Sequence, residues 1–211
     1  MNYDFGFIFM HISLLMFILM FGYIVRIKNK KQIHYAFLTL IINTFVWAIG
    51  ATGIEYCYRL NKPINEIMIW ISYIGLIFTP VVILYLGIIF AKGKITFSWK
   101  HILIIIIPVI SLILLFTNNY HHLFYKYIKY EDLTSSKALG NYFFVHTIYS
   151  YICIVIGLGY LMYYSKKNAG FFSKQSIFIT IGIAISFIYN SILIQSFLIR
   201  FFILWRAYLP I

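Results

Sequence analysis

The chain has 211 residues, of which 63% are hydrophobic and 10% are charged, and its formal net charge is +12. A soluble domain carries about a quarter charged residues and could not cover this much apolar surface, so the composition excludes a soluble fold. The positive charge does not indicate a nucleic-acid partner, because the Lys and Arg residues lie in short gaps between apolar runs and not on one solvated face. Two cysteines, Cys57 and Cys153, are too few for a disulfide framework or a four-cysteine metal site.

Six uncharged apolar runs follow one another along the chain. At about 1.5 Å per residue, about 20 helical residues cross a hydrocarbon core of roughly 30 Å, and a helix satisfies its own backbone hydrogen bonds in lipid. The predicted spans are Phe5 to Val25, Tyr35 to Ile54, Ile67 to Ala91, His101 to Thr117, His146 to Tyr164, and Gln175 to Ile199. We therefore predict an all-α, polytopic helical membrane bundle of about six spans, within a range of about five to seven, as a single domain over residues 1–211.

The ends and the interior of these runs give further expectations. The first run lacks a basic segment before it and an A-x-A-like site after it, so it is predicted to remain as a span and not to be removed as a signal peptide. Pro80 and Pro108 lie inside the third and fourth runs, where they predict kinks whose freed carbonyls are satisfied by neighbouring helices. After Ile199, an aromatic segment bracketed by Arg200 and Arg206 is too short to cross independently, and we expect it at the membrane interface.

Basic residues are concentrated in the first, third and fifth gaps, which contain no acidic residue. These gaps hold ten of the 17 Lys and Arg residues: Arg26, Lys28, Lys30, Lys31, Lys92, Lys94, Lys100, Lys166, Lys167 and Lys174. The positive-inside rule places these gaps in the cytoplasm and the N-terminus outside, and with six spans the C-terminal tail lies outside as well. The five acidic residues, Asp4, Glu55, Glu66, Glu131 and Asp132, then all lie outside.

The longest gap, residues 118–145, is expected to be an external loop. Loops of more than about 12 to 15 residues are commonly functional or disordered, and the many Tyr and Phe residues favour a folded cap over a disordered segment. Three histidines in or beside it, His121, His122 and His146, could join Glu131 and Asp132 as ligands of an external Zn²⁺. Adjacent helical residues point about 100° apart, however, so we expect no metal site and expect His121 and His122 to pair with polar loop groups.

The sequence carries none of the common motifs of membrane enzymes. Phosphate-binding glycine loops, a G-x-S-x-G serine, an H-E-x-x-H pair and a C-x-x-C pair are all absent. No predicted span contains a carboxylate or a lysine, which argues against catalysis within the bilayer and against a proton-coupled transporter. We therefore expect no catalytic residue and no cofactor.

Uncharged polar residues inside the spans are expected to hydrogen-bond between helices, at about 0.6 kcal/mol each. They are His11, Asn43, Thr44, Thr52, Ser72, Thr79, Ser111, Ser150, Ser186 and Asn190. A single imidazole, His11, is also a candidate for sensing protonation.

Several short motifs occur in the order found in one family. Trp47 and Glu55 surround the end of the second run, Tyr73-Ile74-Gly75 precedes Pro80 in the third, and Pro108 lies in the fourth. The segment from Thr117-Asn118 to Tyr125 contains the pattern T-N-x-x-H-x-L-[FYW], and the segment from Gly140 to His146, followed by Tyr149 and Tyr151, has the pattern G-x-x-[FW]-x-x-H. Over residues 5–190 the chain resembles the N-terminal seven-helix sensor region of bacterial histidine kinases.

The resemblance implies a sensory input module in the plasma membrane with an external or membrane-embedded stimulus. In that family the output is a cytoplasmic histidine kinase or diguanylate cyclase that follows a seventh helix. Sensor kinases act as dimers, so the resemblance also implies a homodimer or another membrane signalling partner, although Gly157 and Gly159 are too sparse to define a dimer face.

The region from Gln195 to Ile211 departs from the family pattern. It lacks an Asp-x-[ST]-Pro-like turn, and the sequence has no phosphoacceptor segment and no ATP-binding glycine boxes. We therefore expect either the product of a truncated sensor gene or a free-standing input module, without enzymatic activity of its own.

The candidate signal-sensing residues centre on the external cap. They are His121, His122, His146 and Glu55, with Trp47 and Tyr73 as packing supports, while Pro80, Pro108, Thr117 and Asn118 are positions of the family motifs. Two other functions stay open: a small transporter or channel with a polar pathway around Asn43, Ser72 and Asn190, and a structural or assembly partner of a larger membrane complex. Flux in proteoliposomes distinguishes the first, and co-purification with a larger complex distinguishes the second.

Overall fold

The computed structural model describes residues 5–96, 98–127, 138–167, 174 and 176–188, and most of them are helical. The helices are α1 (Phe5–Val25), α2 (Gln32–Arg59), α3 (Glu66–Lys92), α4 (Trp99–Phe116), α5 (Asn118–His121) and α6 (Asn141–Lys167), and a further apolar helix covers Ser176–Ile188. Within the described residues, extended pairing is limited to an isolated antiparallel bridge between Tyr125 and Leu139. The predicted all-α fold is confirmed.

Four helices, α1, α2, α3 and α6, are long and apolar enough to cross a membrane. The 18 residues of α4 and the helix Ser176–Ile188 are apolar as well but form shorter apolar stretches. At about 1.5 Å per residue, α4 is about 27 Å long, which is close to the thickness of a hydrocarbon core. The chain is therefore a multi-pass membrane protein. The end of the predicted sixth span and the tail after Ile199 lie outside the described residues.

The observed helices extend beyond most of the predicted runs. The predicted and observed bounds agree for α1, but α2 continues to Arg59 instead of ending at Ile54, and α6 begins at Asn141 instead of His146. Charged and polar residues end the hydrocarbon-facing run without ending the helix, because the helix supplies its own backbone hydrogen bonds on either side of the membrane boundary. The predicted external loop, residues 118–145, therefore contains α5 and the first residues of α6.

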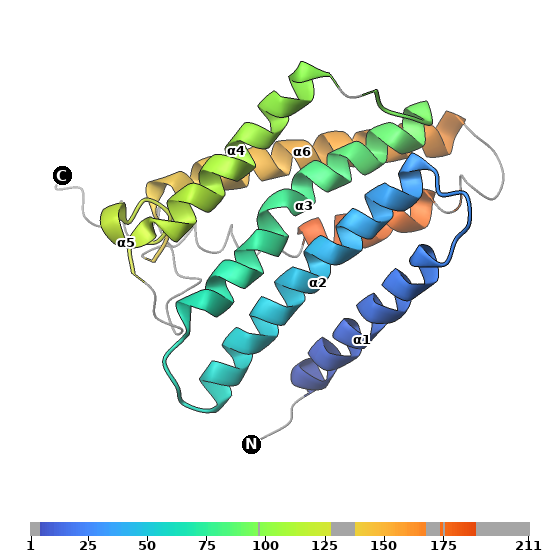
Figure 1. Cartoon of the computed structure of the whole chain (residues 1–211). Helices are drawn as coiled ribbons and strands as arrows, with labels where there is room; N and C mark the ends of the chain where they lie inside the picture. Colours follow the sequence, from blue (N-terminus) through green and yellow to red (C-terminus); the bar gives the residue numbers. More distant parts are fainter. Residues whose placement is uncertain (1–4, 97, 128–137, 168–173, 175, 189–211) are drawn as a thin grey trace, which may run out of the picture.

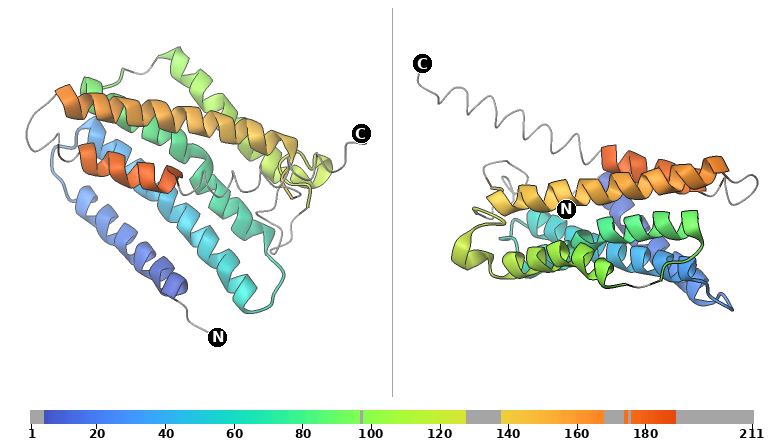
Figure 2. Two further views of the ribbon diagram at one scale, coloured as in Figure 1. Left: turned by 180° about the vertical axis from the view of Figure 1, so that it is seen from behind. Right: turned by 90° about the horizontal axis from the view of Figure 1, so that it is seen from above.

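The helices run up and down, and successive connections alternate between the two ends of the bundle (Figure 1). Helix α3 lies between α2 and α4, and α1 packs on the far side of α2 (Figure 1). Helix α6 and the helix Ser176–Ile188 lie on one face of this row, with α6 packed against α3 (Figure 2). We call the end with the α2–α3 turn and α5 the outer end, and the end with the α1–α2 turn and the α3–α4 connection the inner end.

Glycines allow α3 to touch its neighbours along the main chain. A Cβ atom added to Gly75 would lie 2.2 Å from the Asn43 carbonyl oxygen of α2, and one added to Gly87 would lie 2.3 Å from the Gly157 carbonyl oxygen of α6. Small residues at such crossings bring helix backbones together, which is the main source of packing energy between helices in lipid. Gly157 therefore serves contacts within the bundle, whereas a Cβ on Gly159 would meet nothing within 4 Å.

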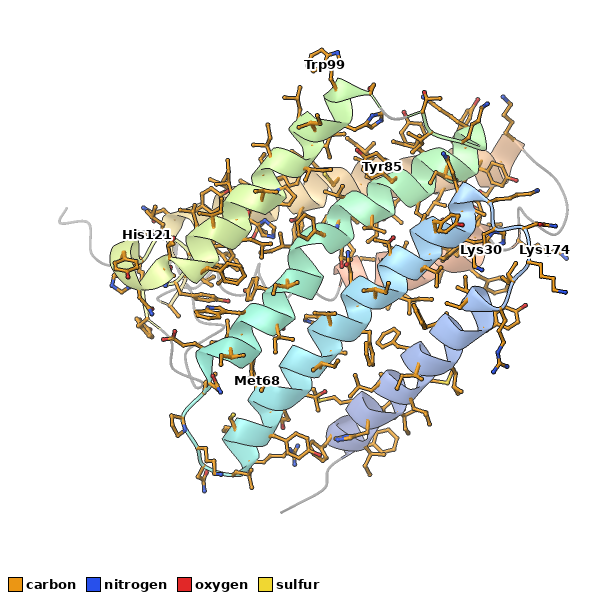
Figure 3. The ribbon with its side chains drawn as sticks, viewed as in Figure 1. Lys30, Met68, Tyr85, Trp99, His121 and Lys174 are labelled. Atoms are coloured by element: carbon orange, nitrogen blue, oxygen red, sulfur yellow. The ribbon has the colours of Figure 1, made fainter. Side chains whose placement is uncertain are left out.

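Because the helices run up and down, the basic residues of the α1–α2 turn lie at the inner end and the described acidic residues lie at the outer end. Figure 3 shows Lys30 and Lys174 at the inner end and His121 at the outer end. Glu55, near the end of α2, and Glu66, the first residue of α3, lie at the outer end with Arg59. This separation agrees with the predicted topology, in which the positive-inside rule assigns the inner end to the cytoplasm.

We predict that Gly87→Ala destabilises the bundle and that Gly159→Ala does not. The added methyl group at Gly87 meets a main-chain oxygen that cannot rotate away, and overpacking of this kind costs about 1–3 kcal/mol. At Gly159 the space is open, so the better helix propensity of alanine is expected to leave stability unchanged or to raise it by up to about 1 kcal/mol. Thermal unfolding of the two purified variants in one detergent measures the difference. Equal unfolding temperatures would contradict the assigned crossing.

Candidate functional site

A buried asparagine organises the turn that follows α4. The Asn118 side chain is only 4% exposed, and its Oδ1 atom accepts hydrogen bonds from the N–H groups of Phe124 at 3.0 Å and Tyr125 at 2.9 Å. Its Nδ2 atom donates to the Tyr125 carbonyl oxygen at 2.9 Å. One side chain thus pairs three main-chain groups that would otherwise be buried without partners, which closes the turn over residues 118–125.

The closed turn is joined to the start of α6 by main-chain hydrogen bonds. The N–H of Lys126 donates to the Ala138 carbonyl, the N–H of Gly140 donates to the Phe124 carbonyl, and the N–H of Tyr142 donates to the Leu123 carbonyl, at 2.8 to 3.0 Å. Gly140 is needed here, because a Cβ atom would lie 2.0 Å from the Leu123 oxygen. We call residues 117–127 and 138–140 the outer cap.

Phe124 anchors the outer cap on the bundle. Its side chain is fully buried, and its ring contacts those of Tyr73 on α3 and of Phe143 and His146 on α6, at centroid distances of 5.2, 5.7 and 6.2 Å. The hydroxyl groups of Tyr73 and Tyr125 share a hydrogen bond beside this cluster. Burial raises the pKa of the Tyr125 hydroxyl well above its usual range, so this group keeps its proton.

His146 joins α4 to α6 through two serines. The imidazole is buried, with Nδ1 at 3.0 Å from the Ser111 hydroxyl and Nε2 at 3.3 Å from the Ser150 hydroxyl. The Ser111 hydroxyl also lies 2.7 Å from the Ile107 carbonyl oxygen and 3.4 Å from the Tyr142 hydroxyl of α6. The imidazole therefore links Ser111 of α4 to Ser150 of its own helix through its two ring nitrogens.

The region of α4 around Pro108 is joined to α6 as well. Pro108 has no N–H group, which frees the carbonyl of Ile104 one turn earlier, and the Tyr149 hydroxyl of α6 donates a hydrogen bond to that carbonyl. The prediction that a neighbouring helix satisfies the freed carbonyl is confirmed for Pro108. Pro80 is buried inside α3, where the adjacent Thr79 hydroxyl donates to the Gly75 carbonyl.

The two adjacent histidines have separate environments. His121 accepts a hydrogen bond from the Leu123 N–H group on Nδ1 and bonds to the Thr117 hydroxyl through Nε2, each at 3.0 Å. His122 is exposed and ends α5 in the left-handed conformation, with φ of 52°. Hence His121 holds the turn of the outer cap, whereas His146 lies beneath Phe124.

Two predicted site residues lie away from the outer cap. Glu55 accepts a hydrogen bond from Arg59 Nε at 2.8 Å, and the Arg59 guanidinium lies over the Phe7 ring of α1 at 4.5 Å. Nearby, His11 of α1 bonds to the Tyr56 hydroxyl at 2.9 Å, so this group fastens α1 to α2. Trp47 is 42% exposed along α2, and its main chain lies against Gly75 of α3.

The described residues do not form a metal site, and they include only part of the predicted polar pathway. They contain no group of three or more His, Cys, Asp or Glu side chains that could hold a metal ion, and Glu131 and Asp132 lie outside them. Asn43 and Ser72 lie where the α2 and α3 backbones touch, at Gly75 and Gly50 respectively, and Asn190 lies outside the described residues.

Phe124 and Ser111 are central to the site but were not predicted as site residues. Phe124 has no distinguishing signal in a chain with 21 phenylalanines, and Ser111 was only one of several polar residues inside spans. The signal for Asn118 was clearer, since an asparagine directly after an apolar run is a common turn residue.

Asn118→Ala is predicted to open the outer cap. The change leaves three buried main-chain groups without their partner, at a cost of about 2 kcal/mol or more. The matched control is Asn119→Ala, because the Asn119 amide makes an exposed 3.3 Å contact with Glu66 and its loss is expected to cost less than about 0.5 kcal/mol. Hydrogen exchange of the Phe124 and Tyr125 amides reports the opening. Equal protection in both variants would contradict the role of Asn118.

Comparison with known proteins identifies one family. The family model described as the N-terminal 7TM region of histidine kinase matches residues 7–204. No curated protein and no solved structure matches the chain.

Proposed function

This chain belongs to the family of N-terminal 7TM regions of histidine kinases, and we propose that it is the signal-sensing input module of a two-component or related signalling system. The family region is a non-catalytic membrane input domain, so phosphotransfer or cyclase chemistry belongs to an output domain. The observation that carries the proposal is the extent of the match, from residue 7 to residue 204, which includes almost every described residue of the bundle.

The outer cap, together with the hydrogen bonds from His146 to Ser111 and Ser150 beneath it, forms the proposed sensing element. The cap rests on α3 through Tyr73 and on α6 through Phe143, and directly beneath it His146 connects α6 to Ser111 of α4. A ligand or membrane stimulus that displaces Phe124 would therefore disturb the contact between α4 and α6. Neutral groups form all of these contacts, so they can rearrange without exposing a bare charge to lipid.

Signalling requires two arrangements of the helices and a stimulus that favours one of them. A ligand shifts such an equilibrium only through a difference in its affinity for the two states. We place the difference at α4, because Pro108 interrupts its hydrogen bonds and a few side-chain hydrogen bonds connect it to α6, from Ser111 to His146 and Tyr142 and from Tyr149 to the Ile104 carbonyl. Movement of α4 against α6 would reach the inner end of the bundle through the length of both helices.

The output is expected to be read by a partner or by a second copy of the chain. Sensor kinases act as dimers. When two input modules share one output, a helix movement in the membrane has a larger influence on that output. We therefore propose a homodimer or a complex with a membrane signalling protein, tested by cross-linking of the protein in its native membrane.

Ser111→Ala is predicted to change the signalling output. Both Ser111 and Ser13 donate to a carbonyl of their own helix, at 2.7 and 2.8 Å, but only Ser111 also contacts His146. In the organism that carries the gene, each variant replaces the chromosomal copy, and the phosphorylated fraction of each response regulator is measured. Coupling energies between sites are typically about 1–3 kcal/mol, so we expect at least a fivefold change for Ser111→Ala and none for Ser13→Ala.

Membrane levels of both variants are measured by immunoblotting, so that loss of protein is not mistaken for loss of signal. If deletion of the gene leaves every response regulator unchanged, the input function is wrong. Substrate flux through the purified protein in proteoliposomes would then favour the transporter.

A further inference from the structure

A glutamine side chain joins two connections at the inner end. Gln32, the first residue of α2, donates from Nε2 to the Ile95 carbonyl at 2.9 Å and accepts the Ile95 N–H on Oε1 at 2.7 Å. This two-bond contact, which we call the Gln32 clip, holds the α1–α2 turn against the α3–α4 connection. Because these segments are 63 residues apart in sequence, their proximity could not be read from local patterns.

The clip brings two lysines onto adjoining segments. Lys31 directly precedes Gln32, Lys94 directly precedes Ile95, and both side chains are exposed. Lys30 differs from them, because its Nζ atom donates to the Val25 and Ile27 carbonyls at the end of α1, at 2.8 and 2.9 Å. Lys31 and Lys94 are therefore exposed cations on the two segments that the clip joins.

No carboxylate of the described residues balances this pair. The described acidic residues, Glu55 and Glu66, both lie at the outer end, whereas Arg26 and Lys28 add further positive charge to the α1–α2 turn. Like charges held close together repel, and the repulsion is relieved by an anion placed between them. The Gln32 clip holds together the main-chain segments that carry these two lysines, which favours one anionic group that both side chains can reach.

The position of the two lysines indicates which class of anion they would bind. Lys31 directly precedes α2, and Lys94 lies two residues after the end of α3, so both lie at the ends of helices that are long and apolar enough to cross a membrane. The neighbouring Ile27, Ile33 and Ile95 are half-buried apolar residues at the same level. Lysines at this depth meet the phosphates of lipid headgroups, and anionic lipids attract each such residue near the surface.

We propose that Lys31 and Lys94 bind the phosphate group of an anionic phospholipid at the inner end, with the Gln32 clip setting their separation. The lipid phosphate accepts hydrogen bonds from both ammonium groups, and its acyl chains continue along the apolar surface of the helices. The proposed lipid site lies at the opposite end of the bundle from the outer cap, and lipid binding there can be measured whether or not the proposed sensing function holds.

The test compares two double variants of the full chain that lose the same charge from the same end. Lys31→Gln with Lys94→Gln removes the proposed pair, whereas Lys166→Gln with Lys167→Gln removes two consecutive lysines at the end of α6, a segment that the clip does not join. Each protein is purified in a neutral detergent and titrated with fluorescent phosphatidylglycerol. We expect the dissociation constant to rise about tenfold or more for the first variant and less than about twofold for the second.

A third variant, Gln32→Leu, keeps every charge and breaks the clip. It is expected to weaken phosphatidylglycerol binding several-fold while the helical content and the elution volume stay unchanged. Equal weakening in the two lysine variants, or full binding by Gln32→Leu, would overturn the proposal in favour of a diffuse positive rim.

Inorganic phosphate and phosphatidylcholine complete the experiment. We expect neither to displace the fluorescent phosphatidylglycerol at concentrations that saturate the lipid site. Displacement by inorganic phosphate would show that the site takes the free ion, and displacement by phosphatidylcholine would show that the negative charge is not recognised; either result would overturn the assignment to an anionic lipid. None of these measurements depends on the signalling output.

Discussion

The bundle depends on how closely α3 approaches its neighbours, because lipid removes the hydrophobic gain that drives helix association in water. Without Cβ atoms at Gly75 and Gly87, the α3 backbone reaches the backbones of α2 and α6. These crossings fix the register of the three helices. As a result Tyr73 meets Tyr125 near the outer end, and Lys92 lies 5.9 Å from the Tyr160 ring centre near the inner end.

Helix α4 is attached to this rigid centre in a different way. Many of its large apolar side chains face outward, including Ile102, Leu103 and Ile113, and its connections to α6 include hydrogen bonds from Ser111 to His146 and from Tyr149 to the carbonyl that Pro108 leaves free. Hydrogen bonds between neutral groups are directional and become stronger where water is excluded. These hydrogen bonds specify the position of α4, yet each can break and be replaced by another hydrogen bond without a change in charge.

The sequence was sufficient for features that depend on local composition and not for those that depend on distant partners. Uncharged runs predicted the order of the main helices in the described part of the chain, and Pro108 predicted a carbonyl that needs a donor. The same runs missed the helix ends, since Arg59 and Lys167 continue their helices beyond the hydrocarbon region. Phe124 could not be recognised as the anchor of the outer cap, because its role follows from Tyr73 and His146 on two other helices. Glu55 was grouped with the cap by position along the chain, whereas its partner is Arg59, which contacts α1.

The two ends of the protein are linked through α4. At the outer end, His146 and the outer cap hold α4 against α6. At the inner end, the connection into α4 is held by the Gln32 clip to the start of α2. Because main-chain contacts at the glycine crossings hold α2, α3 and α6 together, a movement of α4 would act on Pro108 and, through the connection before Trp99, on the clip. A lipid bound beside the clip and a stimulus bound at the cap would then bias the same helix, and their effects on each other's affinity must be equal by linkage. The lipid composition of the membrane would therefore set the threshold at which the outer cap responds.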